Sequence, residues 1–184
     1  GGSDSDILNF SAFGSGRNVT LTDTGSVEGV TGTEASLSAG FDNMNGLVGS
    51  TFIDTLVGIN IANTWNITSS NAGNIGGAFT FSSIELLTGG SDTDTLNFSS
   101  FGSGRSVTLT GVGPDGFAGT EASLGSGFDN MNSLVGTAFN DTLVGANIAN
   151  VWNITDNNIG NISSLFPFNS IENLIGGNDD DTFI

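Results

Sequence analysis

The feature that most constrains this chain is that it repeats itself. The opening GGSDSDILNF returns as GGSDTDTLNF at 89–98, and TEASLSAGFDNMNGLVG at 33–49 returns as TEASLGSGFDNMNSLVG at 120–136. The offset is 88 residues at first and 87 after the loop near Gly113. Self-similarity at a fixed period is typical of repeat architectures, in which stacked copies bury a shared core.

Each long repeat also contains two related halves. Four segments align without gaps, and they begin at Phe41, Phe81, Phe128 and Phe168. We therefore divide the chain into repeat 1 at 1–88 (halves 1–48 and 49–88), repeat 2 at 89–175 (halves 89–135 and 136–175) and the start of repeat 3 at 176–184.

A nine-residue unit lies inside the halves. GFDNMNGLV, GSTFIDTLV and GINIANTWN run consecutively from Gly40 to Asn66, each with Gly first, Asp or Asn sixth and a large apolar residue eighth. The other half is less regular, and Arg17 and Arg105 take its eighth position. Each half is thus three units followed by an insert of about 13 or 20 residues.

Two of these units resemble the calcium-binding nonapeptide of RTX proteins, Gly-Gly-x-Gly-x-Asp-x-Leu-x. They are GGSDTDTLN at Gly89–Asn97 and GTAFNDTLV at Gly136–Val144. The family's Gly at the fourth position is replaced here by Phe52, Asp92, Phe139 or Asp179. The repeats are also similar to those of filamentous haemagglutinins and RTX adhesins. The resemblance implies a parallel β-roll, bound Ca²⁺ and a place in a large bacterial surface protein.

Local composition predicts strands and turns. Segments such as SVTLT, WNIT and DTLNF are short, rich in β-branched or aromatic residues and separated by Gly, Asn, Asp and Ser. Alternation places Leu56 and Leu96 inward, with Thr55, Val57 and Asn97 outward. We expect an all-β parallel β-solenoid in which matching positions lie over one another. A half would make about two coils, so a full repeat would advance about 19 Å. The alternative is a tandem of Ig-like β-sandwiches, for which ~87 residues is an ordinary size.

Acidic turns are the candidate metal sites. Ca²⁺ takes six to eight oxygen ligands, and Gly-Asp turns supply carboxylates and carbonyls. Like-charged aspartates in adjacent coils would repel one another without an ion between them. Turn formation or a neutral Asn ladder is the alternative role. The candidate ligands are Asp4, Asp6, Asp54, Asp92, Asp94, Asp141, Asp179 and Asp181.

The composition narrows the functional classes. The chain has no Cys, His or Lys, two Arg and a formal net charge of −17. Such a surface repels nucleic acid and anionic lipid, and no apolar run is long enough to insert in a membrane. Most catalytic nucleophiles and bases are missing, and the acids recur in every repeat, so we expect no enzyme. We expect an extracellular or cell-surface structural segment whose partners are neighbouring repeats, copies of itself or surface glycans.

Two residue types allow more than one role. Trp65 and Trp152 fall in the apolar column, where core packing is the main expectation and a sugar-stacking platform the alternative. Arg17 and Arg105 are expected to lie along the coil with their charged ends paired to an acid. A lateral contact with a neighbouring filament is the second reading of the two arginines.

Overall fold

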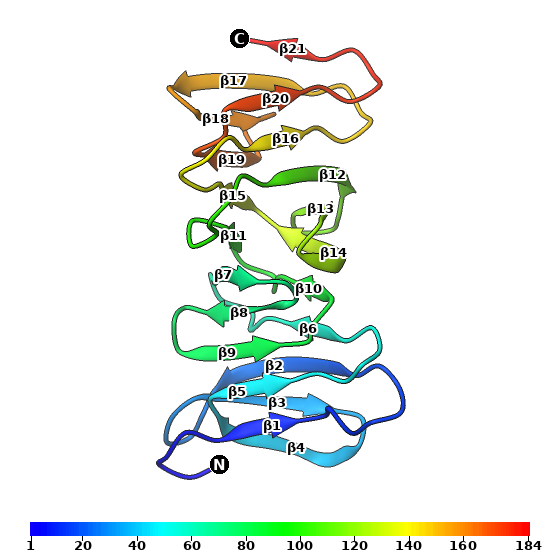
Figure 1. The fold of residues 1–184 in the computed structure, drawn as a ribbon, viewed down its shortest axis with the longest axis vertical. Coiled ribbons are helices and arrows are strands. Elements are labelled where there is room, and N and C mark those ends of the chain that lie inside the picture. The colour runs from blue at the N-terminus through cyan, green and yellow to red at the C-terminus, as the bar shows by residue number, and fades with distance from the viewer.

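The computed structural model describes residues 1–184 and contains 21 β-strands and no α-helix. The strands stack in two sheets, so that the chain climbs from the N-terminus at one end to the C-terminus at the other (Figure 1). The prediction of an all-β parallel β-solenoid is confirmed. Nothing helical is present that has the length and apolar character to cross a bilayer.

We call the two sheets sheet A and sheet B. In spatial order, sheet A contains β1 (Ile7–Asn9), β5 (Gly46–Val48), β9 (Phe79–Ser82), β8 (Ala72–Ile75), β7 (Thr64–Ser69), β11 (Thr95–Asn97), β15 (Ser133–Val135), β19 (Phe166–Asn169), β18 (Ile159–Ile162), β17 (Val151–Asp156) and β21 (Thr182–Phe183). Sheet B contains β4 (Leu37–Met44), β3 (Val30–Glu34), β2 (Asn18–Thr24), β6 (Thr55–Val57), β10 (Leu86–Thr88), β14 (Leu124–Met131), β13 (Phe117–Glu121), β12 (Ser106–Val112), β16 (Thr142–Val144) and β20 (Asn173–Ile175).

One nine-residue unit forms one strand and one turn, which is half a coil. The three units from Gly40 to Asn66 end in β5, β6 and the start of β7, and these strands lie in sheets A, B and A in turn. Strands of successive coils pair in parallel, as Leu86–Thr88 does with Thr55–Val57. One unit therefore supplies a strand to one sheet and the turn that leads to the opposite sheet, and two units complete a coil.

The inserts do not form further coils, contrary to the expectation of two coils in each half. Each insert instead extends one strand and adds two antiparallel ones, giving a three-stranded meander within a single sheet. The four meanders are β2–β3–β4, β7–β8–β9, β12–β13–β14 and β17–β18–β19. Each half-repeat is thus one and a half coils, with one of its strands widened into a meander.

The odd number of units sets where each meander lies. After three half-coils the chain is on the sheet opposite to the one where it started. Successive meanders therefore lie in sheets B, A, B and A. Only the full repeat brings the same element back to the same sheet. Five ladder steps separate β1 from β11, which is about 24 Å at the usual strand spacing. The advance expected from the sequence, about 19 Å, is therefore too small by one step.

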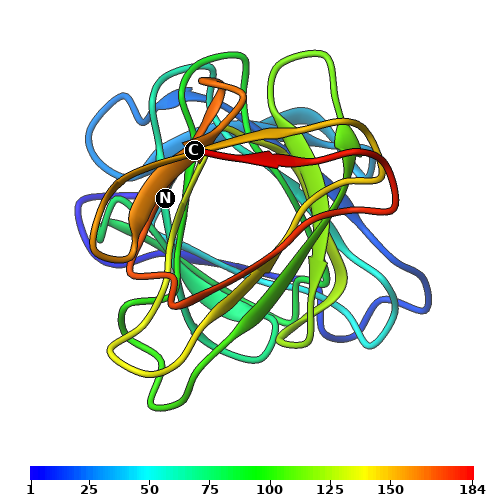
Figure 2. The same cartoon turned by 90° about the horizontal axis from the view of Figure 1, so that it is seen from above.

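A single core runs between the two sheets. Thirty buried apolar residues form one cluster, and it includes both Leu56 and Leu96 at 0% exposure. Leu56 lies between Val19 and Leu87 in sheet B, whereas Leu96 lies beside Trp65 in sheet A. Matching positions of successive halves thus lie in opposite sheets, so the expectation that they lie directly over one another is wrong for half-repeats. The view along the axis shows the coils enclosing this shared interior (Figure 2), and separate sandwiches are excluded.

Each meander contains a glycine covered by a phenylalanine ring. The phenylalanines are the residues that begin the four segments aligned above, and the glycine is their partner on the central strand. A Cβ on that glycine would meet both the ring and a backbone carbonyl oxygen of the preceding strand. The ring fills the space that the missing side chain leaves. The pairs are Gly32–Phe41, Gly73–Phe81, Gly119–Phe128 and Gly160–Phe168.

Candidate functional site

The sixth-position residues of the nine-residue units link neighbouring turns along the corners of the solenoid. In each link a side-chain oxygen accepts a hydrogen bond from a backbone N–H in the adjacent turn. The Asp6 N–H donates to Asn45 Oδ1 at 3.0 Å, and the Asp94 N–H donates to Asn132 Oδ1 at 2.7 Å. Asn45 and Asn132 take the same part as the acids, whereas Asn63 and Asn150 donate Nδ2 to carbonyls of their own turn and to the aspartate of the next. Both arrangements agree with the predicted turn and ladder role.

Asp54 shows how a buried carboxylate is accommodated in a turn. Its side chain is 0% exposed. Oδ1 accepts the Arg17 N–H, and Oδ2 accepts the Ser50 N–H at 2.7 Å and the Ser50 hydroxyl at 2.9 Å. Asp141 has the equivalent donors in repeat 2, from Arg105 and Thr137. Hydrogen bonds to an ionised acceptor are about twice as strong as neutral ones, so these donors stabilise the buried charge.

Asp94 and Asp181 hold matching places with different surroundings. Asp94 accepts from Asn63 Nδ2 at 2.9 Å and from Trp65 Nε1 at 3.2 Å, but its Oδ2 is buried without a partner. Burial raises the pKa of Asp94 above its ordinary value. At Asp181 burial also works against ionisation, but hydrogen bonds from the Asn150 side chain and N–H outweigh it, and the pKa is lowered. The two carboxylates have equivalent donors, so the opposite pKa shifts follow from burial, which is complete at Asp94 and only partial at Asp181.

The eight predicted metal ligands are not brought together. Asp54, Asp94 and Asp141 are buried, whereas Asp4, Asp92 and Asp179 are exposed. The turns that carry the exposed three precede β1, β11 and β21, which lie five ladder steps apart, or about 24 Å. No group of three or more acidic side chains lies close enough to hold a metal ion. The expectation of like-charged aspartates in adjacent coils is wrong, because the aspartates are separated by intervening strands; the acids next to Asp54 and Asp141 are Glu85 and Glu172, which accept the aspartates' N–H groups. Bound calcium stays a prediction.

We expect calcium removal to leave the fold unchanged, because N–H and O–H donors already occupy the carboxylates of Asp54 and Asp141. The thermal melting curve of the chain in a calcium-free buffer with a chelator should coincide with the curve in millimolar calcium. Magnesium at the same ionic strength is the control for charge screening. A higher melting temperature with calcium than with magnesium would restore calcium as a structural ligand.

The two arginines are held inside the protein. The Arg17 guanidinium pairs with Glu34 and lies 4.3 Å from the centre of the Phe13 ring, and Arg105 pairs with Glu121 over Phe101. The glutamate side chains are 1% exposed. The predicted pairing with an acid is confirmed. The predicted position is wrong: Val19 and Val107 occupy the inward column, because the preceding turn is two residues longer than the nine-residue alignment allows.

The Arg17–Glu34 pair predicts a pH dependence of stability. Burial disfavours ionised Glu34, but hydrogen bonds from Ser36 and the Arg17 guanidinium outweigh it, so its pKa is lowered. A lowered folded-state pKa stabilises the fold above the unfolded-state pKa, and this contribution is lost as the pH falls through the folded-state pKa. Glu34→Gln should cost about 2 kcal/mol at pH 7, and the cost should shrink below pH ~4.

Urea denaturation of both chains across this pH range measures the difference. Glu28→Gln is the matched control, because Glu28 is half-buried and forms no ion pair. A cost for Glu34→Gln that stays constant down to pH ~3 would show that the carboxylate charge contributes nothing.

Both tryptophans are core residues. Trp65 and Trp152 are 0% exposed, and each ring contacts the phenylalanine of its own meander, Phe81 and Phe168. The predicted core role is confirmed. The alternative of a sugar-stacking platform is wrong for both residues, since neither indole face is accessible to a ligand.

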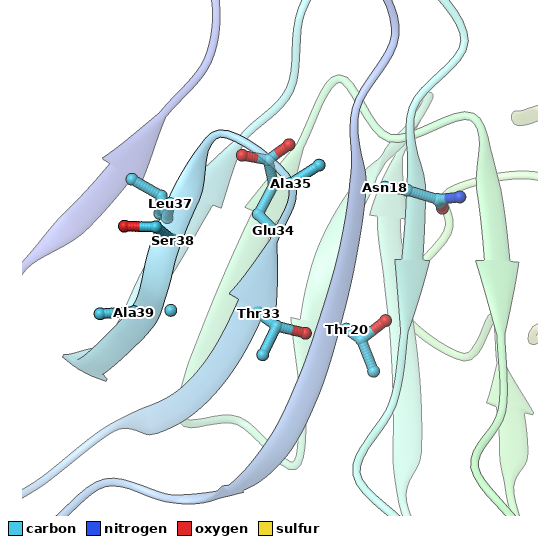
Figure 3. A pocket seen from close by; sticks show the side chains of 9 residues that line it. Asn18, Thr20, Thr33, Glu34, Ala35, Leu37, Ser38 and Ala39 are labelled. Atoms are coloured by element: carbon cyan, nitrogen blue, oxygen red, sulfur yellow. The ribbon is translucent and has the colours of Figure 1, made fainter.

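A shallow groove recurs on the outer face of sheet B. In repeat 1 it has a volume of about 570 Å³ and is lined by Asn18, Thr20, Thr33 and Ser38 among others. Figure 3 shows the hydroxyls of Thr20 and Thr33 at this surface. The equivalent groove of repeat 2, of about 400 Å³, carries Thr108 and Thr120. The one acid in each lining is the glutamate already paired with arginine, so no free carboxylate is available there for catalysis.

With this geometry established, the chain was compared with known proteins. No protein-family model, curated protein or solved structure matches it. The class of protein is therefore defined by the fold itself, a two-sheet β-solenoid with a meander in every half-repeat. The resemblance to RTX repeats stays a prediction.

Proposed function

We propose that this chain is a structural, non-catalytic repeat segment of an extracellular fibre, such as a surface filament or the stalk of an adhesin. One observation carries the proposal: the hydrogen-bonded ladder and the apolar core both continue from one end of the chain to the other. Sheet A alone has ten ladder steps, or about 48 Å. Such an array gains length by adding repeats, because each repeat contacts only its neighbours.

The chemistry of the surface supports an extended, spacer-like role. Apart from Asp156 at the end of β17, no strand of sheet A contains a charged residue. Its outer face carries bonded amides instead, such as Asn97 Nδ2 to Asn66 Oδ1 at 2.8 Å and Asn66 Nδ2 to Asn74 Oδ1 at 2.9 Å. Most of the acids lie at the corners. A chain of net charge −17 repels its copies side by side.

An extracellular location is supported by the arginines. They are the only cations, and their side chains are 13% and 14% exposed. Proteases that cut after Lys or Arg thus have two candidate bonds, both at the start of paired strands. We expect the native chain to resist trypsin and the urea-unfolded chain to be cut at both.

Small-angle scattering of the monomeric chain tests the proposal. A structural rod should give a pair-distance distribution that is skewed to long distances, with one cross-section throughout. The same rod should persist in a chain of three or four repeats, with its length increasing by about 24 Å per repeat. A compact, near-spherical particle, or a longer chain whose repeats move independently, would contradict the rod.

A further inference from the structure

The shallow groove on the outer face of sheet B has the size and lining of a binding site. In repeat 2 it lies over the meander β12–β13–β14 and has a volume of about 400 Å³, which is within the usual range for small-ligand sites. Both outer strands of this meander are paired with further strands, β12 with β16 and β14 with β10. The groove is therefore an interior feature of the solenoid, and repeat 1 has its equivalent over β2–β3–β4.

A glycine in the last strand of each meander helps to keep the groove open. Gly127 has a positive φ of 84°, and a Cβ at this position would lie 2.3 Å from the carbonyl oxygen of Gly119. Gly40 is its counterpart in repeat 1, with φ 71° and a distance of 2.5 Å to the Gly32 carbonyl oxygen. Glycine alone adopts this conformation at no steric cost, so no side chain fills either groove at this position.

The groove presents hydroxyl groups that have no hydrogen-bond partner within the chain. Thr108 and Thr120 are opposed on β12 and β13, as Thr20 and Thr33 are in repeat 1. Figure 3 shows the side chains of this second pair next to one another. A hydroxyl both donates and accepts, so each groove offers a cluster of free donors and acceptors. The hydroxyl residues of the repeat 2 groove are Ser106, Thr108, Thr120 and Ser126.

The outer face of sheet A differs, because its polar side chains bond to one another. The hydroxyls of Thr95 and Ser133 are 2.7 Å apart, and Asn97 Nδ2 donates to Asn66 Oδ1 at 2.8 Å. A hollow of about 490 Å³ on this face is lined by the bonded Thr95 and Ser133 and by apolar residues such as Val135. A ligand there would have to displace existing hydrogen bonds, whereas a ligand on sheet B would not.

The charges of the molecule restrict the class of ligand. Glu121 is the one ionisable residue in the repeat 2 lining, and its carboxylate is 1% exposed and already bonded to Arg105 and Ser123. Both arginines, the only cations of the chain, are paired in this way. No cation is left to hold a sulfate, phosphate or uronate group, and a net charge of −17 repels anions. The groove suits a ligand that is rich in hydroxyls and uncharged.

We propose that the sheet B groove binds a neutral glycan, whose hydroxyls exchange hydrogen bonds with the opposed threonines. The glycan is bound without being cleaved, because glycosidases use a pair of carboxyl groups and the groove has no free one. The inference goes beyond the structural role by adding a ligand to it. Neutral hydrogen bonds at a wet surface contribute little each, so we expect a Kd of about 1 mM for one groove. Recurrence of the groove in every repeat would give an array higher avidity.

An NMR titration of the isotope-labelled chain tests this site. The probes are three neutral hexasaccharides, maltohexaose, mannohexaose and xylohexaose, each added to well above the expected Kd. At least one should cause saturable shifts of the backbone amides of Thr108 and Thr120, and of Thr20 and Thr33. The hexamer of galacturonic acid, which carries a carboxylate on every sugar, should cause none.

Paired variants use one groove as the reference for the other. Thr108→Val/Thr120→Val keeps the β-branched shape but removes both hydroxyls, and should lower the affinity of the repeat 2 groove by about tenfold or more. The repeat 1 groove of the same molecule should bind as before. Thr20→Val/Thr33→Val should give the reverse pattern. Thr95→Val, on sheet A, is the control that should leave both grooves unchanged.

Three results would each overturn the assignment. The first is that none of the neutral hexasaccharides shifts the groove amides, or that the shifts lie in the sheet A hollow instead. The second is that both double variants keep the parental affinity. The third is that the galacturonic acid hexamer binds as well as the neutral probes, because the lining would then not select an uncharged ligand. None of these results alters the scattering expected of the rod, so the structural role is tested separately.

Discussion

Gly73→Ala should destabilise the protein by about 3 kcal/mol or more, although it adds one methyl group. The new Cβ would fall on the carbonyl oxygen of Asn66 and lie 2.9 Å from the Phe81 ring. The carbonyl belongs to the paired strand β7 and cannot move without loss of ladder hydrogen bonds, so the strand must shift. Overpacking of a rigid core costs about 1 to 3 kcal/mol and occasionally more, and contact with backbone places this site at the upper end.

The matched control is Gly111→Ala, because Gly111 also lies in a meander strand but has no atom within 4 Å of its would-be Cβ. Its free energy of unfolding should stay within about 0.5 kcal/mol of the parent value. Urea denaturation of the three chains gives the comparison. Equal stability of both variants would show that the meander accommodates a side chain at its centre, and that the Gly–Phe pairing is incidental.

Trp65→Ala should cost about 3 to 5 kcal/mol, the range for truncating a large buried aromatic residue. The indole is fully buried, contacts Phe81 and donates Nε1 to Asp94. Its removal leaves a cavity and takes one of two donors from a carboxylate whose pKa is already raised by burial. Since domains are commonly stable by about 5 to 15 kcal/mol, much of the total would be lost.

Phe139→Ala is the control for this prediction, because its ring is 49% exposed and lies in a turn. It should leave the unfolding midpoint almost unchanged. Hydrogen exchange adds a spatial test: repeats contact only their neighbours, so protection in Trp65→Ala should fall first in the coils around β7. A cost below about 1 kcal/mol would mean that the core does not depend on this side chain.

How much of this arrangement is readable from sequence depends on which residues are periodic. Alternation around Leu56 and Trp65 correctly predicts the inward and outward faces, because a strand has only two sides. The spacing of Gly and Asp predicts one turn per nine residues. Neither pattern predicts which sheet the next strand joins. Only the structure shows that Leu56 and Leu96 lie in opposite sheets.

The sequence repeat does not predict the fold of the inserts or the position of the arginine side chains, and the reasons are related. An insert has no internal period, so nothing marks Gly73 as the centre of a meander except its recurrence before Phe81. Arg17 is in the eighth position of its unit by count, but a turn of variable length moves Val19 into the core instead. Asp4, Asp92 and Asp179 occupy equivalent turns in the sequence repeat, but the intervening meanders keep these turns apart along the axis.

The alternation of the meanders between the two sheets has a mechanical consequence. Extra strands in one sheet lengthen that side of the solenoid relative to the other, so meanders confined to sheet A would curve every repeat in the same direction. Here each repeat places one meander on each side, and the two curvatures oppose one another. An array of such repeats should therefore run straight over many copies, with bending confined to within a single repeat.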